Sequence, residues 1–164
     1  MSREPPMPQR GEHNYSATVV WTGNSGEGTK HYRAFSRDHE ITCGDKPTIA
    51  GSADPAFLGD LSRYNPEELL LSSLSACHML WYLHLCADAG ITVSSYEDNA
   101  EGRMIETKSG RGHFDKVTLK PIVSIGENDD SDLATSLHEK AHSLCFIANS
   151  VNFEVACEPE IRRG

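Results

Sequence analysis

The feature that most constrains this chain is a 24-residue segment, residues 66–89, that is apolar on almost every side. Asn65 suits the N-cap of a helix, Pro66 suits the first helical position, and two glutamates follow them. The segment ends before Gly90, a residue type that commonly terminates helices. It therefore predicts a helix roughly 36 Å long.

A helix that is hydrophobic on all sides is either buried on all sides or crosses a membrane. Serine and histidine residues interrupt the apolar run, and no other segment has a membrane-spanning pattern. We therefore expect a buried helix and no membrane partner. One small sheet cannot cover every face of such a helix, which indicates that a second chain covers the rest.

Alternating apolar and polar residues predict strands on both sides of this helix. Before it, strands are expected over residues 15–21, 31–37 and 40–43, with loop from residue 44 to 64. After it, strands are expected over residues 92–105, 113–125 and 151–157, with a second helix over 131–149. This order is typical of the α+β class. Residues 1–13 carry three prolines and are expected to form a flexible tail before a single domain, residues 14–164.

Composition excludes several kinds of partner. The 24 acidic residues outnumber the 15 basic ones, and a net charge of -9 disfavours binding to nucleic acids and to anionic membranes. The five cysteines lie far apart and form no C-x-x-C pair. Because the N-terminus has no apolar core of a signal peptide, we expect a cytoplasmic protein with reduced thiols.

Two cysteines lie on the predicted helices. Cys77 is in the middle of the apolar helix, too far from its start for the helix dipole to activate a thiol, so reactivity there requires a nearby cation. Cys145 falls with His138 and His142 on the flank of the apolar stripe of the second helix. Plain packing explains each cysteine equally well. A metal site of His138, His142 and Cys145 is a further alternative, since zinc prefers imidazole and thiolate.

The combination of these motifs is more specific than either cysteine alone. The run from Asn65 to Leu70, followed by Ser75, Ala76 and Cys77, resembles the signature of the OsmC/Ohr family of hydroperoxide-reducing enzymes. The second half is similar too, with Ala141, His142 and Cys145 on a helix before Asn149 and a strand. The resemblance covers about residues 15–158.

The resemblance implies an OsmC-like α+β fold, with two antiparallel sheets around a long central helix in an intertwined homodimer. It implies a two-cysteine peroxidase in which Cys77 is peroxidatic, Cys145 is resolving and Glu67 orients an arginine beside the Cys77 thiolate. The partners would be a small organic hydroperoxide and a thiol or dithiol reductant, with no cofactor. The family arginine does not align cleanly, so Arg63 before the helix and Arg37 on the second expected strand are both candidates.

Two points qualify how this site would be built. Glu67 and Cys77 are ten residues apart on one helix, or roughly 15 Å, so a site that uses both would take Glu67 from the partner chain or from a non-helical start of the segment. Phe146 follows Cys145 where the family commonly has proline. The predicted function is a thiol peroxidase for organic hydroperoxides, with hydrogen peroxide as a further substrate. The alternative is a non-catalytic redox sensor, or a metal- or ligand-binding protein, on the same fold.

Overall fold

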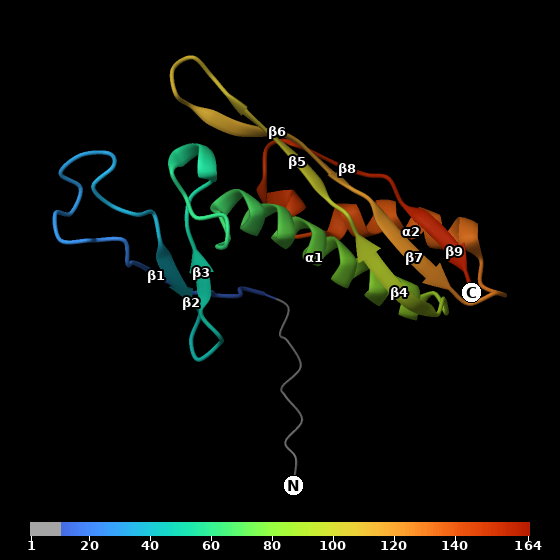
Figure 1. Cartoon of the computed structure of the whole chain (residues 1–164). Helices are drawn as coiled ribbons and strands as arrows, with labels where there is room; N and C mark the ends of the chain where they lie inside the picture. The colour runs from blue at the N-terminus through green and yellow to red at the C-terminus, as the bar shows by residue number, and fades with distance from the viewer. Residues whose placement is uncertain (1–10) are drawn as a thin grey trace, which may run out of the picture. The chain divides into compact units, whose positions relative to one another are not determined.

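The computed structural model describes residues 11–164, which Figure 1 traces from the N-terminal to the C-terminal end. The chain forms two compact units, the first extending to Pro66 and the second running from Glu67 to Gly164. Most of the expected tail, residues 1–10, lies outside the described residues. The single domain expected from residue 14 onward stays a prediction.

A small antiparallel sheet forms the centre of the N-terminal unit. Its strands are, in spatial order, β1 (Thr18–Trp21), β2 (His39–Thr42) and β3 (Ile49–Gly51). The middle strand places Ile41 opposite Val19 on one side and opposite Ile49 on the other. A short 3-10 helix, η1 (Pro55–Phe57), follows, and the Asp54 carboxylate caps it by accepting the Ala56 N–H at 2.7 Å. The first and third strands expected before the long helix are therefore present.

The strand expected over residues 31–37 is wrong, because this segment forms turns and bends. The Ala34 N–H donates to the His31 carbonyl at 2.9 Å, which is a turn hydrogen bond and not a sheet ladder. Phe35 makes only an isolated bridge to Asn24. The local turn chemistry of this loop thus overrides its weak alternation of apolar and charged residues.

The long helix of the C-terminal unit, α1 (Pro66–Asp88), begins and ends close to the predicted residues. Gly90 follows with a φ of 74°, the left-handed conformation that glycine adopts without strain. The next amide, of Ile91, donates to the Cys86 carbonyl at 2.9 Å and closes the helix end. The buried residues of α1 lie along one face, namely Leu74, His78, Tyr82, Leu85 and Cys86.

Two three-stranded sheets complete the C-terminal unit with the second helix, α2 (Ser131–Leu144). One sheet contains β4 (Val93–Asp98), β7 (Pro121–Ile125) and β9 (Glu160–Arg163), in that order. The other contains β5 (Glu101–Glu106), β6 (Gly112–Leu119) and β8 (Glu154–Cys157). Each sheet joins an antiparallel pair to a parallel one, since β9 runs parallel to β7 and β8 parallel to β6. The α+β class is as expected, but the strands of the described residues divide into three sheets, and they are not all antiparallel.

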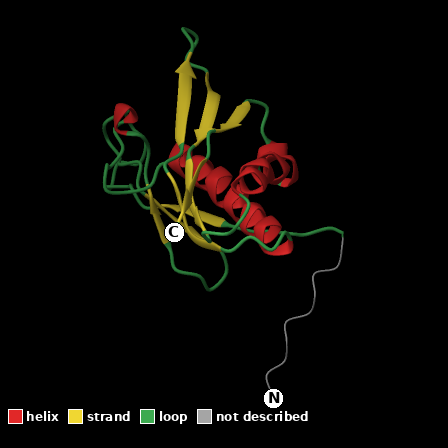
Figure 2. Cartoon of the chain, turned by 90° about the vertical axis from the view of Figure 1, so that its right-hand side faces the viewer, coloured by secondary structure: helices red, strands yellow, loops and turns green. Residues whose placement is uncertain are grey.

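The buried face of α1 contributes to two hydrophobic cores. Near its start, Leu74 packs with Phe114, Val117 and Leu119 of β6. Near its end, a second core joins α1 to α2 and to β7, with Tyr82, Leu85, Val123, Ile125, Ala134 and Ala141 among its members. Figure 2 shows α1 and α2 side by side next to the strands of this unit. The two helices are linked by the Tyr82 hydroxyl, which donates to the Ala134 carbonyl at 3.0 Å.

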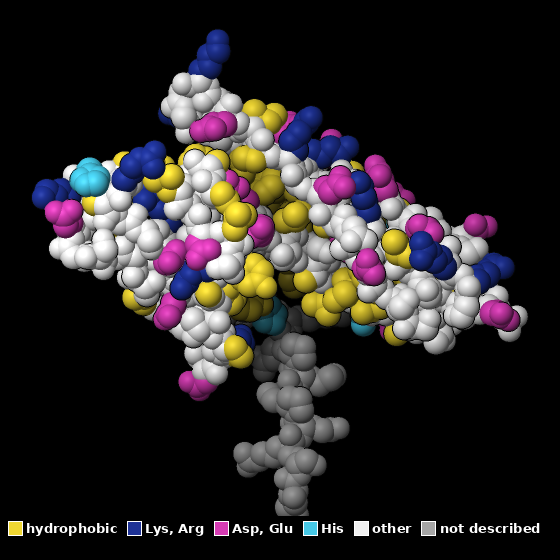
Figure 3. Space-filling model, in the orientation of Figure 1, with side chains coloured by type: hydrophobic (Ala, Val, Ile, Leu, Met, Phe, Trp, Pro, Cys, Tyr) yellow, Lys and Arg dark blue, Asp and Glu magenta, His cyan; other side chains and the backbone are white. Residues whose placement is uncertain are grey.

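Much of the remaining surface of α1 is apolar and uncovered. By length and composition this helix could cross a membrane. Only 28% of its most apolar window is buried within the chain. Leu80 is 63% exposed in the middle of the helix, and in Figure 3 hydrophobic side chains gather over the region of α1. Since the opposite face of α1 builds both cores of its unit, we interpret it as the central helix of a globular fold with one apolar face left open.

Candidate active site

The structure brings Cys77 and Cys145 together within the C-terminal unit. Cys77 lies half-buried in the middle of α1, and Cys145 is the residue at which α2 ends. Both are free thiols, and they lie close enough for Cys77 to act on the ionisation of Cys145. They are 68 positions apart in the sequence, so it is the packing of α2 against α1 that creates the pair.

The backbone at the end of α2 holds the Cys145 sulfur in place. The Cys145 N–H donates to the His142 carbonyl at 3.3 Å, and the chain then leaves helical geometry. It turns back as a 3-10 helix, η2 (Ala148–Ser150), so that the Ala148 N–H donates to the Cys145 Sγ at 3.4 Å. This turn forms with Phe146 directly after the cysteine.

Burial and neighbouring groups act in opposite directions on the Cys145 thiol. Its side chain is only 2% exposed, and burial is the main reason that its pKa is raised to about 11. The adjacent Cys77 thiol raises the pKa further, whereas the Ala148 and Ile147 N–H groups lower it by stabilising the thiolate. Cys145 therefore stays protonated near neutral pH. Cys77 is the more accessible of the two thiols.

Glu67 does not reach Cys77 within one chain. Both lie on the continuous helix α1, with Glu67 in its first turn and Cys77 ten residues further on. The rise of an α-helix separates them by roughly 15 Å along the axis. Within one chain, Glu67 therefore cannot place its carboxylate beside the Cys77 thiol.

The two candidate arginines are held by groups of their own unit. The Arg37 guanidinium stacks over the rings of Tyr32 and Phe35, 4.4 and 4.2 Å from their centroids, and donates to both of their carbonyls. The Arg63 Nε lies 3.7 Å from an oxygen of Asp38. Both arginines belong to the N-terminal unit and Cys77 to the C-terminal unit. An arginine beside Cys77 therefore stays a prediction.

Aromatic side chains lie next to the cysteine pair. Trp81 is one helical turn after Cys77. Its ring packs edge-on against that of Phe146, with the ring centroids 5.7 Å apart. Phe146 is largely exposed, as is Leu80 on the same helix. Met79, on the same helix, borders a separate cavity with Tyr96.

Among the described residues, the structure does not gather the three residues that the sequence offers as an alternative metal site into one group. His138 points toward His78 and Cys157, and these three side chains form a group whose candidate ligand atoms all lie within 4.8 Å of one another. His142 and Cys145 are not part of this group. The sequence did not reveal it, because His78 and Cys157 are 60 and 19 residues away from His138.

Comparison with known proteins places these features in a family. Residues 59–160 match the OsmC-like protein family. The chain belongs to this family. An OsmC-like protein of unknown function from Vibrio cholerae is 33% identical, and the two structures superpose with a TM-score of 0.81 over 90% of this chain and 99% of the other. The uncharacterized protein YmaD of Bacillus subtilis is 28% identical over 105 residues, which are 61% of this chain and 69% of YmaD.

More distant members of the family share the fold. The organic hydroperoxide resistance protein OhrB of Bacillus subtilis is 20% identical, with a TM-score of 0.59 over 90% of this chain and 98% of OhrB. An organic hydroperoxide resistance protein from Elizabethkingia anophelis is 16% identical, with a TM-score of 0.68 over 95% and 100% of the two chains. The OsmC-like fold expected from the sequence is thus confirmed. The family includes proteins of organic hydroperoxide resistance, although these particular members are similar to this chain in fold alone.

Proposed function

We propose that this OsmC-like protein is a thiol-dependent peroxidase that reduces organic hydroperoxides, with hydrogen peroxide as a further substrate. The observation that carries the proposal is the pairing of an accessible thiol, Cys77, with a neighbouring buried thiol, Cys145. Two neighbouring cysteines can form and break a disulfide without large movement of the backbone. The membership in a family that includes organic hydroperoxide resistance proteins supports the same reaction.

The proposed reaction begins at Cys77. Its thiolate attacks one oxygen of the hydroperoxide, the O–O bond breaks, and the alkoxide leaves and takes a proton from water to become an alcohol. Cys77 is thereby oxidised to a sulfenic acid. Cys145 then attacks this sulfur, a disulfide forms and water leaves. A dithiol reductant returns both cysteines to thiols by exchange and is itself oxidised to a disulfide.

The division of roles follows from accessibility and from the groups around each sulfur. A peroxidatic thiol must meet a substrate from solvent, and Cys77 is half-buried whereas Cys145 is 2% exposed. A resolving thiol needs only to reach its neighbour. The Ala148 N–H that donates to the Cys145 Sγ favours the thiolate at the moment of that attack.

The open apolar face of α1 supports a homodimer as the working form. A helix with Leu80 largely exposed at its centre would bury this surface against a second copy of the chain. Because Glu67 lies roughly 15 Å from Cys77 on the same helix, we propose that Glu67 of the partner subunit, with Arg63 or Arg37, completes the site. The arginine would supply the cation that stabilises the Cys77 thiolate.

The aromatic pair beside the cysteines supports a bulky, apolar substrate. Trp81 and Phe146 present an edge-on ring pair, and the neighbouring Leu80 adds aliphatic surface. Such side chains gain more from contact with an organic group than from contact with hydrogen peroxide. A cytoplasmic location, where dithiol reductants are available, is part of this proposal.

Steady-state consumption of cumene hydroperoxide with dihydrolipoamide as reductant tests the proposal. The variants are Cys77→Ser and Cys145→Ser, and the matched control is Cys43→Ser, which removes a free, half-buried thiol of the N-terminal unit. We expect Cys77→Ser to abolish turnover. We expect Cys145→Ser to lose dithiol-driven turnover while Cys77 still forms a sulfenic acid that dimedone traps. The control should keep the wild-type rate.

Two results would count against the proposal. If the wild-type protein consumes no peroxide although both thiols titrate as reduced, the proposal of a peroxidase is refuted. A redox sensor on the same fold is then the better interpretation. If Cys145→Ser turns over as fast as wild type with the dithiol, the resolving role of Cys145 fails.

A further inference from the structure

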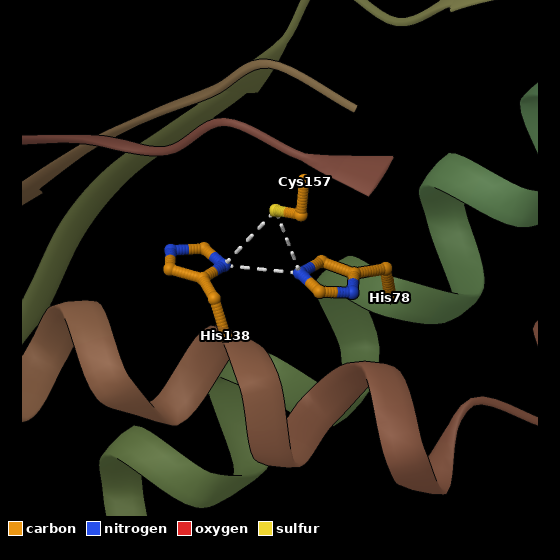
Figure 4. A group of neighbouring side chains, drawn as sticks. All are labelled: His78, His138 and Cys157. Carbon is orange, nitrogen blue, oxygen red and sulfur yellow. Dashed lines mark hydrogen bonds between the residues drawn. The ribbon is translucent and has the colours of Figure 1, made fainter. Parts of the chain in front are cut away.

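A second group of side chains lies in the core of the C-terminal unit and has no part in the proposed peroxidase reaction. His78 comes from α1, His138 from α2 and Cys157 from the end of β8, and Figure 4 shows that the three point toward one another. His78 is 1% exposed and His138 is 3% exposed. Buried imidazole and thiol groups that converge from three distant segments need an explanation beyond packing.

We infer that His78, His138 and Cys157 form a binding site for a transition-metal ion that prefers imidazole and thiolate ligands, such as Zn²⁺ or Cu⁺. Soft thiolate ligands select these two ions, and imidazole suits both of them. The inference is independent of the proposed peroxidase reaction, because it uses neither Cys77 nor Cys145.

The distances between the candidate ligand atoms are close to those that a metal ion imposes. His78 Nε2 and His138 Nδ1 are 3.0 Å apart, and Cys157 Sγ lies 3.7 and 3.9 Å from them. Tetrahedral zinc, with bonds of about 2.0–2.1 Å to nitrogen and about 2.3 Å to sulfur, sets these separations at about 3.3 Å and about 3.6 Å. Shifts of about 0.3 Å, within reach of small side-chain rotations, therefore seat the ion.

The protonation states of the two histidines suit a metal. Burial lowers the pKa of His78 to about 4 and that of His138 to about 3, so both rings are neutral near pH 7 and carry a free lone pair. Burial and the nearby Asp98 carboxylate raise the pKa of Cys157 to about 12. A bound cation would reverse this effect and hold Cys157 as the thiolate.

A negative charge lies close to the site. The Asp98 carboxylate acts electrostatically on both His78 and Cys157. It is fixed by two donors, the Ser75 hydroxyl and the Lys120 N–H. A Zn²⁺ ion bound to one thiolate keeps a net positive charge, and a nearby carboxylate such as that of Asp98 stabilises this charge.

The histidine pair is poorly satisfied as a purely structural element. Among the described residues, the outward nitrogens His78 Nδ1 and His138 Nε2 have no hydrogen-bond partner. Each neutral ring has one N–H. If one ring donates its N–H in the bond between His78 Nε2 and His138 Nδ1, the ring that accepts carries its own N–H on the outward nitrogen, where it is buried and unpaired. Buried groups of this kind are uncommon in proteins and often mark a functional site.

The site has a route to solvent and room for a further ligand. A cavity of about 310 Å³ is bordered by His138 and Cys157 and also by Glu139 and His142. Three protein ligands with an open fourth position that water fills are a common arrangement for zinc. A bound ion would tie α1, α2 and β8 together and raise the stability of the folded chain.

Metal binding to the reduced full chain, stripped of metal by a chelator, tests the inference. Co²⁺ is the spectroscopic probe, because thiolate-to-cobalt charge transfer reports a cysteine ligand. Zn²⁺ and Cu⁺ are titrated against chromogenic chelators. The variants are Cys157→Ser, the matched control Cys86→Ser (another buried thiol of the same core), and the double variant Cys77→Ser/Cys145→Ser. Circular dichroism verifies that each variant is folded.

We expect one Co²⁺ per chain with a thiolate charge-transfer band in the wild type, in the Cys86→Ser control and in the double variant. We expect Cys157→Ser to lose the band and to weaken binding of Zn²⁺ or Cu⁺ by at least about tenfold. The inference is overturned if folded wild-type protein shows no band, if the band survives in Cys157→Ser, or if it disappears in the double variant. If Cys157→Ser does not fold, the other spectra still test the inference, since a missing wild-type band, or a band that is lost in Cys86→Ser or in the double variant, overturns it.

Discussion

The hydrogen bond between Tyr82 and Ala134 offers a stringent test of how α1 and α2 are joined. Tyr82 is fully buried, and its hydroxyl donates to the Ala134 carbonyl at 3.0 Å. Its ring stacks on that of His138, with centroids 3.7 Å apart and an interplanar angle of 11°. The change Tyr82→Phe keeps the ring and this stacking and removes only the hydroxyl.

The cost of Tyr82→Phe follows from what the hydroxyl leaves behind. The Ala134 carbonyl keeps the hydrogen bond of its own helix, so the acceptor is not stranded completely. The Cys86 thiol, which also interacts with the hydroxyl, is a weak hydrogen-bonding group. The loss is therefore mainly that of the buried hydrogen bond to Ala134, about 1–2 kcal/mol in the free energy of unfolding. For a chain of this size the melting temperature would fall by roughly 2–8 °C.

Urea unfolding at a fixed protein concentration measures this cost, with Tyr15→Phe as the control because Tyr15 is 89% exposed. We expect the midpoint of Tyr82→Phe to fall with an unchanged slope and the control to stay within about 0.5 kcal/mol of wild type. A cost equal to that of the control would refute the hydrogen bond. A cost above about 4 kcal/mol would refute the claim that the ring keeps its place.

Three further predictions address the surface, the buried histidines and the thiols. Leu80→Asp places a charge on the open face of α1, and we expect sedimentation to show a shift from dimer to monomer; an unchanged dimer would contradict that interface. Because the pKa values of His78 and His138 are lowered in the folded chain, the unfolded chain takes up protons first as the pH falls. The free energy of unfolding in urea should therefore decrease as the pH drops from about 6.5 to about 4. An unfolding free energy that does not change over this range would contradict the burial of the two rings in their neutral form. Because burial raises the pKa of Cys145 to about 11, iodoacetamide at pH 8 should alkylate it more slowly than Cys77, as peptide mass spectrometry would show, and equal rates would contradict its burial.

The parts of the fold that sequence reasoning predicts well depend on strong local signals. The helix α1 begins at Pro66 because Asn65, Pro66 and Glu67 each favour a helix start, and it closes at Gly90 because glycine tolerates a positive φ. Local signals were weaker elsewhere. Pro121 divides the expected strand over residues 113–125 into β6 and β7, and the short strand β9 was not expected.

The candidate sites likewise include residues that the sequence suggests and residues that it does not. The motifs around Cys77 and Cys145 single out both cysteines as candidates, and the structure places them as neighbours. The group of His78, His138 and Cys157 has no local signature, because its members are up to 79 residues apart and meet only after α1, α2 and β8 have packed. Periodicity places His138 on a helix flank, but it cannot tell which distant side chain that flank meets.

The most direct test of the account is a single turnover of reduced wild-type protein with one equivalent of cumene hydroperoxide, followed by alkylation and peptide mapping. The account predicts that one hydroperoxide is consumed per chain and that one disulfide forms, between Cys77 and Cys145, with Cys43, Cys86 and Cys157 still alkylated as thiols. A disulfide that involves any of those three cysteines, or full recovery of the Cys77 and Cys145 thiols after exposure to the hydroperoxide, would contradict it.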